Sequence, residues 1–201
     1  MPRRDAGRER GVGGASLGAA LLLGAALFAA ASAYGAEIEG VHLDDRISLA
    51  GRPLILNGAG VRAKLLLRIY VVALYLPKPV KDVSGVFARA PRRIQMNMLL
   101  SVSADEIVAA LLDTMADNSS PAELAAVKPQ TDRMVALIRR FKAVRKGDVV
   151  TLDFVAGGTN LRWNGALRGR ISGATFDRAL SRIWLGDKPV QADLKDKLLG
   201  R

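Results

Sequence analysis

The run from Ala63 to Leu76 constrains the fold of this chain most, because it is apolar on both faces that a β-strand would present. A strand of this kind belongs at the centre of a sheet that is covered on both sides. Pro77 and Pro79 end the run, since proline cannot donate a hydrogen bond to a sheet ladder. We expect the preceding segment, Asn57 to Gly60, to form a turn that delivers Arg62 to the start of this central strand.

The remaining segments predict an α+β fold, in which a largely antiparallel β-sheet carries a layer of helices on one face. Periodicity and turn residues predict further strands at 37–43, 47–49, 54–56, 92–100, 149–155, 161–163 and 166–171. The predicted helices cover 83–87, a segment opened by a capping box at Ser103 and Glu106, about 122–142 with a break or kink at Pro129, 175–185 and 192–199. Asn164-Gly165 is a strong signal for a tight hairpin turn.

The first 33 residues have the pattern of a secretory signal peptide. Four arginines precede an apolar segment from Leu17 to Ala30, and Ala31-Ser32-Ala33 matches a cleavage site. We therefore expect residues 34–201 to form one exported domain, periplasmic after cleavage. The alternative is an uncleaved anchor, because 12–33 is just long enough to span a bilayer.

The composition narrows the classes of partner and cofactor. The formal net charge is +11, of which residues 34–201 carry +9, so contact with an anionic membrane surface or with small anions is favoured. Nucleic acid is not an expected partner, because export and the absence of a binding motif argue against it. Cysteine is absent and His42 is the single histidine, which excludes His/Cys metal sites. We expect no metal and no cofactor.

Arg62 is the first candidate for a ligand-binding residue. If the strand is unbroken, Arg62, Lys64, Leu66, Arg68 and Tyr70 share one face. Two guanidinium groups and a phenol in that arrangement suit a carboxylate, phenolate or enolate, because the planar arginine fork can bind an anion through two hydrogen bonds. The alternative is that Arg62 pairs with an aspartate or glutamate while Lys64 and Arg68 reach solvent.

Three segments carry a family resemblance: Gly58-Ala59-Gly60-Val61-Arg62, Tyr70–Pro77 and the predicted helix Phe176–Gly186. They resemble the chalcone isomerase family, and the resemblance extends over nearly all of 37–200. Two further segments, Asn164–Gly169 and Ile183–Pro189, look like the bacterial, exported branch of that family. The resemblance implies an open-faced β-sandwich, an antiparallel sheet with helices packed on one face. Plant members of the family close chalcones to flavanones, whereas related members bind fatty acids and are not enzymes.

Carried over residue by residue, the family's site is largely replaced by apolar side chains. The family's arginine corresponds to Arg62, and the threonine of the following strand to Tyr70. A helix tyrosine falls near Ile107, an asparagine near Thr114 and a second threonine on Ile183. No tyrosine follows Tyr75, so realignment cannot restore the helix tyrosine. Loss of such donors typically slows a reaction by orders of magnitude, because they stabilise the transition state.

Three functions follow from this pattern. The first is a non-catalytic binder of a small apolar anion such as a fatty acid, with Arg62, Tyr70, Arg68, Ile107, Thr114 and Ile183 as the candidate binding residues. The second is an isomerase or intramolecular lyase that uses Arg62 as electrophile and Tyr70 as donor. The third is an interaction module of the cell envelope whose basic surface meets anionic lipid or a partner. The first two require an open cleft beside Arg62.

Overall fold

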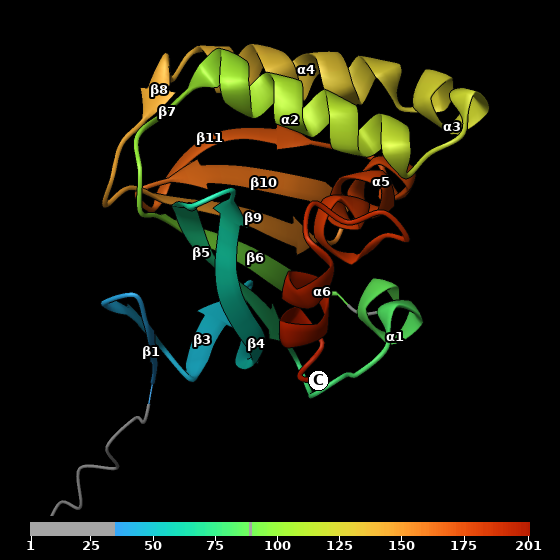
Figure 1. Cartoon of the computed structure of the whole chain (residues 1–201). Coiled ribbons are helices and arrows are strands. Elements are labelled where there is room, and N and C mark those ends of the chain that lie inside the picture. The colour runs from blue at the N-terminus through green and yellow to red at the C-terminus, as the bar shows by residue number, and fades with distance from the viewer. Residues whose placement is uncertain (1–34, 89) are drawn as a thin grey trace, which may run out of the picture. The chain divides into compact units, whose positions relative to one another are not determined.

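The computed structural model describes residues 35–88 and 90–201, and the predicted leader lies outside them (Figure 1). Seven antiparallel strands form the main sheet in the spatial order β11-β10-β9-β6-β5-β4-β3. These strands are β3 (Arg46–Leu49), β4 (Arg52–Lys64), β5 (Leu67–Leu76), β6 (Arg92–Met98), β9 (Val149–Val155), β10 (Gly158–Trp163) and β11 (Ala166–Ile171). Two small hairpins pair β1 (Ala36–Ile38) with β2 (Val41–Leu43) and β7 (Val102–Ser103) with β8 (Ala143–Val144).

Helices cover one face of this sheet, which confirms the predicted α+β class. They are α1 (Val83–Phe87), α2 (Ala104–Asp117), α3 (Pro121–Ala126), α4 (Lys128–Arg139), α5 (Ala174–Leu185) and α6 (Ala192–Leu198). Figure 1 shows α2 and α4 side by side over β10 and β11, with α6 against β4. The larger apolar core lies between these helices and the sheet, and a smaller one lies on the opposite face beneath β1 and β2.

Strand β5 is central and covered on both faces, as its apolar sequence predicts. Val72, Leu74 and Leu76 are buried in the larger core. Val71, Ala73 and Tyr75 alternate with them and are buried in the smaller one. Successive side chains of a strand point to opposite faces, so both cores meet at this strand.

The predicted single strand from Ala63 to Leu76 is wrong, because the chain turns back at Leu65 and Leu66. The turn consists of leucines rather than glycine or asparagine, and Leu65 has a positive φ of 54°. The predicted turn at 57–60 is wrong as well: these residues lie inside the long strand β4. A β-bulge between Leu56 and Gly58 bends the strand there.

The glycines of β4 serve the packing of a helix. A β-carbon on Gly58 would lie 2.0 Å from the carbonyl oxygen of Lys197, and one on Gly60 would lie 2.8 Å from Leu194 Cδ1. Glycine therefore lets α6 lie directly on β4. At the bulge, the Asn57 side chain donates to the carbonyl oxygen of Leu198 at 2.7 Å, which satisfies a carbonyl at the end of that helix.

Local signals placed most other boundaries correctly. The capping box at Ser103 and Glu106 opens α2, and Asn164 and Gly165 form the β10–β11 turn with positive φ angles. The predicted helix over 122–142 is two helices that meet at Val127, with a proline in the first turn of each. The predicted strand 37–43 is the β1–β2 hairpin, which turns at Glu39 and Gly40. Within the described residues, no helix has the length and apolar character needed to cross a bilayer.

Candidate functional site

A groove of about 820 Å³ lies between the sheet and α2. Its floor comes from β5, β6, β9 and β10, one wall from α2, and the other from the β4–β5 hairpin and the segment after α5. Most of its inner side chains are apolar, among them Met96, Ile107, Leu111, Phe141 and Ile183. The volume falls within the roughly 300–1,000 Å³ typical of small-molecule sites. The sequence-based site therefore coincides with a space that a ligand could enter.

Arg62 and Tyr70 are paired residues on adjacent strands, β4 and β5, and both line the groove. Directly opposed residues of an antiparallel pair share a face. The two side chains therefore meet across the hairpin, whereas the prediction placed them along one strand. Arg62 and Tyr70 are therefore close in the hairpin, as they were predicted to be. A second bulge, between Arg62 and Ala63, shifts the pairing register next to them.

Arg62 has no carboxylate partner among the residues that the structure describes. Its guanidinium donates to the carbonyl oxygen of Ala63 and, at 3.4 Å, to Oε1 of Gln191. That glutamine also accepts from the Ala63 amide at 2.9 Å and donates to the Val61 carbonyl at 3.3 Å. The guanidinium is half-buried and held by neutral acceptors alone. A partly desolvated cation of this kind favours an anionic ligand.

Tyr70 is held by a residue of α5. The indole Nε1 of Trp184 donates to the Tyr70 hydroxyl oxygen at 3.1 Å. Burial raises the pKa of Tyr70, and the bond from Trp184 and the charge of Arg62 offset this only in part. The hydroxyl is therefore protonated at neutral pH, and none of the described groups accepts its hydrogen. It can donate to a ligand in the groove.

Ile107, Thr114 and Ile183 also line the groove, on α2 and α5. The Thr114 hydroxyl donates to the carbonyl oxygen of Ala110 at 2.8 Å, one turn earlier in the helix. Its hydrogen is therefore engaged by the backbone, and Ile107 and Ile183 offer apolar surface. The polar groups of the groove interior are concentrated at its Arg62 end.

Arg68, the sixth predicted residue, is not brought to the groove. The turn at Leu65 and Leu66 reverses the chain before Arg68, and the residue faces the β1–β2 hairpin. Its guanidinium forms an exposed ion pair with Glu39, which lies in the turn of that hairpin. The structure therefore brings together five of the six predicted residues.

The exposed rim of the groove carries charges of both signs. Glu106, Asp113 and Asp117 line it from α2, whereas Arg62 and Lys64 line it from the β4–β5 hairpin. Lys188 lines it at the end of α2, where its backbone amide donates to the side chain of Asn118 at 2.9 Å. An anionic group on a ligand is therefore attracted to the side that carries Arg62.

The sequence did not predict the contacts that Gln191 and Trp184 make with the candidate site. Both act over sequence separations of more than a hundred residues, and no local spacing links them to Arg62 or Tyr70. Glutamine after Pro189 and Val190 carries no motif of its own. Trp184 lies within the predicted helix 175–185, where nothing in the local sequence indicates its bond to Tyr70.

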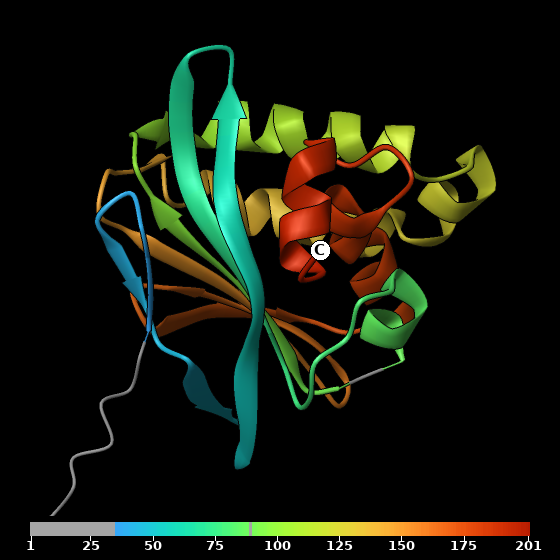
Figure 2. The same cartoon turned by 60° about the horizontal axis from the view of Figure 1, so that its bottom comes forward.

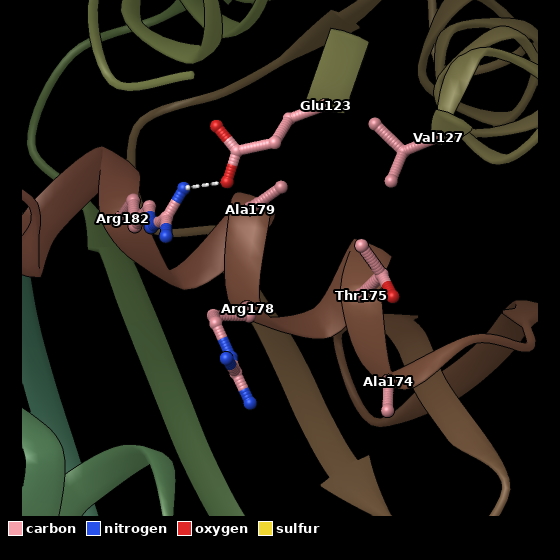
Figure 3. Close-up of a pocket in the computed structure, with 7 residues that line it drawn as sticks. All are labelled: Glu123, Val127, Ala174, Thr175, Arg178, Ala179 and Arg182. Carbon is pink, nitrogen blue, oxygen red and sulfur yellow. Dashed lines mark hydrogen bonds and ion pairs between the residues drawn. The ribbon is translucent and has the colours of Figure 1, made fainter. Parts of the chain in front are cut away.

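A second pocket, of about 160 Å³, lies over α5 (Figure 3). Arg182 and Glu123 at its side form an ion pair of 3.0 Å, so the charge of that arginine is compensated. Figure 3 shows Arg178 extending away from Glu123. The small volume and the internal ion pair make this pocket a weaker candidate for an anionic ligand than the groove.

Comparisons with known proteins agree with the fold. The family model described as chalcone isomerase-like matches residues 35–200. Among solved structures, the chain is similar to a fatty-acid binding protein of Arabidopsis thaliana, with a TM-score of 0.62 and 12% sequence identity. That match covers 82% of this chain and 95% of the other. Comparison with curated proteins gives no match.

Proposed function

The chain belongs to the chalcone isomerase-like family, and we propose that it is a non-catalytic binder of a small apolar anion, such as a fatty acid, held by Arg62. The observation that carries the proposal is a half-buried arginine, without a carboxylate partner among the described residues, at one end of an open apolar groove. The structural similarity to a fatty-acid binding protein supports a small apolar ligand.

The geometry suggests how such a ligand lies. Its anionic head accepts from the Arg62 guanidinium and from the Tyr70 hydroxyl, and its apolar chain lies over Met96, Ile107 and Ile183. A hydrogen bond that involves a charged group contributes about 1.5–3 kcal/mol net. Because every 1.4 kcal/mol is about tenfold in affinity, loss of this interaction weakens binding roughly tenfold to a hundredfold.

Native mass spectrometry of the protein, purified from its own cell compartment without detergent, tests the proposal. We expect a bound species of fatty-acid mass that is absent or strongly reduced in Arg62→Ala. The variant Arg168→Ala is a matched control, because Arg168 is exposed and lies outside the groove. An empty wild-type protein that also fails to bind a panel of added fatty acids would contradict the proposal.

A second candidate function, an isomerase or intramolecular lyase on an unknown substrate, is favoured by the same pair of residues. Arg62 would polarise a carbonyl group, and the Tyr70 hydroxyl, whose raised pKa keeps it protonated, would donate a hydrogen bond to the reacting oxygen. A spectrophotometric chalcone assay separates this candidate from the first. Turnover above the buffer rate that disappears in Arg62→Ala would favour plant-type chemistry; turnover equal to the buffer rate would remove it.

We also propose that the domain acts outside the cytoplasm, after cleavage behind Ala33. The support is the basic start, the apolar segment and the cleavage pattern in residues 1–33. Mass spectrometry of the mature N-terminus tests this directly. A first residue of Tyr34 is expected; a mature chain that retains the apolar segment would indicate the anchored alternative.

A further inference from the structure

One end of the main sheet gathers several turns that are far apart in the sequence. The register pairs Tyr70 with Met98, Asn97 with Val149, and Val150 with Trp163. The β4–β5 turn, the segment after β6, the turn before β9 and the β10–β11 turn therefore lie along the same sheet end. Hydrogen bonds join neighbours in this row, including Leu100 N to Ile69 O at 3.2 Å and Lys146 N to Ser101 Oγ at 3.3 Å.

The β4–β5 turn exposes three consecutive leucines. Leu65, Leu66 and Leu67 are 93%, 98% and 59% exposed, and we call them the leucine tip. Figure 2 shows the hairpin extending past α2, with its tip clear of the helices. A soluble domain usually buries such residues, and a contiguous exposed apolar patch marks an interaction site.

Cations flank the leucine tip along the same sheet end. Lys64 precedes it directly, and Arg145 and Lys146 lie in the turn before β9, on the far side of the segment after β6. All three are exposed, and none belongs to a salt bridge among the described residues. The nearby acids are engaged by other groups. Glu39 pairs with Arg68, and Glu106, which interacts with the charge of Lys64, accepts from the Ser103 hydroxyl at 2.6 Å. Asp148 accepts from Asn164 and from the Arg145 amide. This end therefore presents apolar side chains within a positive field.

We propose that this end of the sheet docks on an anionic lipid bilayer, with Leu65 and Leu66 inserted between the lipids and Lys64, Arg145 and Lys146 at the headgroups. Apolar insertion combined with attraction to anionic lipid is the usual basis of reversible membrane attachment. The convex, narrow tip suits insertion into a bilayer better than contact with a flat protein surface.

The position of the tip connects this surface with the groove. Lys64, Leu65 and Leu67 line the groove as well as the sheet end, so the groove opens beside the docked surface. If the proposed function holds, a lipid-derived ligand could then pass between bilayer and groove without crossing bulk water. The docking itself depends on the tip and the cations rather than on Arg62.

Co-sedimentation with vesicles tests the docking. The purified protein is mixed with vesicles of phosphatidylcholine plus phosphatidylglycerol, and with vesicles of phosphatidylcholine alone. We expect binding to the anionic vesicles, weakened by salt, and a loss of at least about tenfold in the double variant Leu65→Asp/Leu66→Asp. Leu112→Asp is the control, because Leu112 is an exposed leucine of α2 that lies outside this sheet end.

Two results would overturn the docking proposal. The first is vesicle binding that is equal in the wild type and the double variant, because attachment would then use another part of the chain. The second is a wild-type protein that self-associates through the tip without lipid and does not bind vesicles, measured by sedimentation velocity. Two single variants separate the two proposals. Arg62→Ala should lose the ligand and keep vesicle binding, whereas Leu66→Asp, at a tip residue outside the groove lining, should weaken vesicle binding and keep the ligand.

Discussion

At the residue scale, the central feature is a cation held in place without being neutralised. Gln191 accepts a hydrogen bond from Arg62 through its neutral side chain and also bridges the backbone of β4 on both sides of it. The sequence pointed to Arg62 and Tyr70 because an arginine and a phenol within an apolar strand are unusual. It could not point to Gln191, whose role depends on where α6 begins relative to β4.

Tyr70→Phe tests the contact that holds the phenol. The substitution removes the acceptor of Trp184 Nε1, and Trp184 is buried, so its donor is left without a partner. We expect the free energy of unfolding to fall by about 1–3 kcal/mol, measured by urea denaturation. Tyr75→Phe is the control, because the Tyr75 hydroxyl forms no hydrogen bond with the described residues. An equal loss in both variants would show that the Tyr70–Trp184 bond contributes little.

At the element scale, the glycine-rich segment before Arg62 has a different structural role from the one predicted. The pattern predicted a turn, since glycine and asparagine are turn residues. In the structure the same residues allow α6 to lie on β4, and α6 is the helix that follows Gln191. The real turn, at Leu65 and Leu66, lacks any turn residue, which is why a single long strand was predicted.

Gly58→Ala tests this close packing. The added methyl group would meet the backbone of α6 at 2.0 Å, so helix and strand must separate. We expect a loss of stability of about 1–3 kcal/mol and weaker ligand binding, because Gln191 moves with the helix. In Gly60→Ala the nearest atom, at 2.8 Å, ends a leucine side chain, so the loss should be smaller. Thermal unfolding of both variants gives the comparison; equal and small losses would contradict the packing argument.

The wall formed by α2 offers a test of the groove that leaves Arg62 untouched. Ala110 is exposed and lines the groove, whereas Ala116, on the same helix, is exposed and lies outside it. Ala110→Trp should narrow the groove and weaken fatty-acid binding at least about tenfold, and Ala116→Trp should not. Fluorescence displacement of a bound fatty-acid probe measures both. Equal affinities would place the ligand elsewhere.

At the scale of the whole molecule, the order of elements was predictable and the order of strands was not. Hairpins such as β10–β11 depend on a two-residue turn, and the start of α2 depends on a capping box, so both are readable locally. Strand β6, by contrast, pairs with β9 across the intervening helices α2, α3 and α4. That pairing joins the two halves of the sheet and brings the turns to one end, and no local pattern specifies it.

Calorimetric titration with decanoate and 1-decanol isolates the contribution of ligand charge, because these ligands share a chain and differ in the charge of the head. We expect the wild-type protein to bind decanoate at least about tenfold more tightly than 1-decanol, and Arg62→Ala to bind both about equally. Equal binding of the two by the wild type, or a preference for decanoate that persists in Arg62→Ala, would contradict the claim that Arg62 holds an anionic ligand.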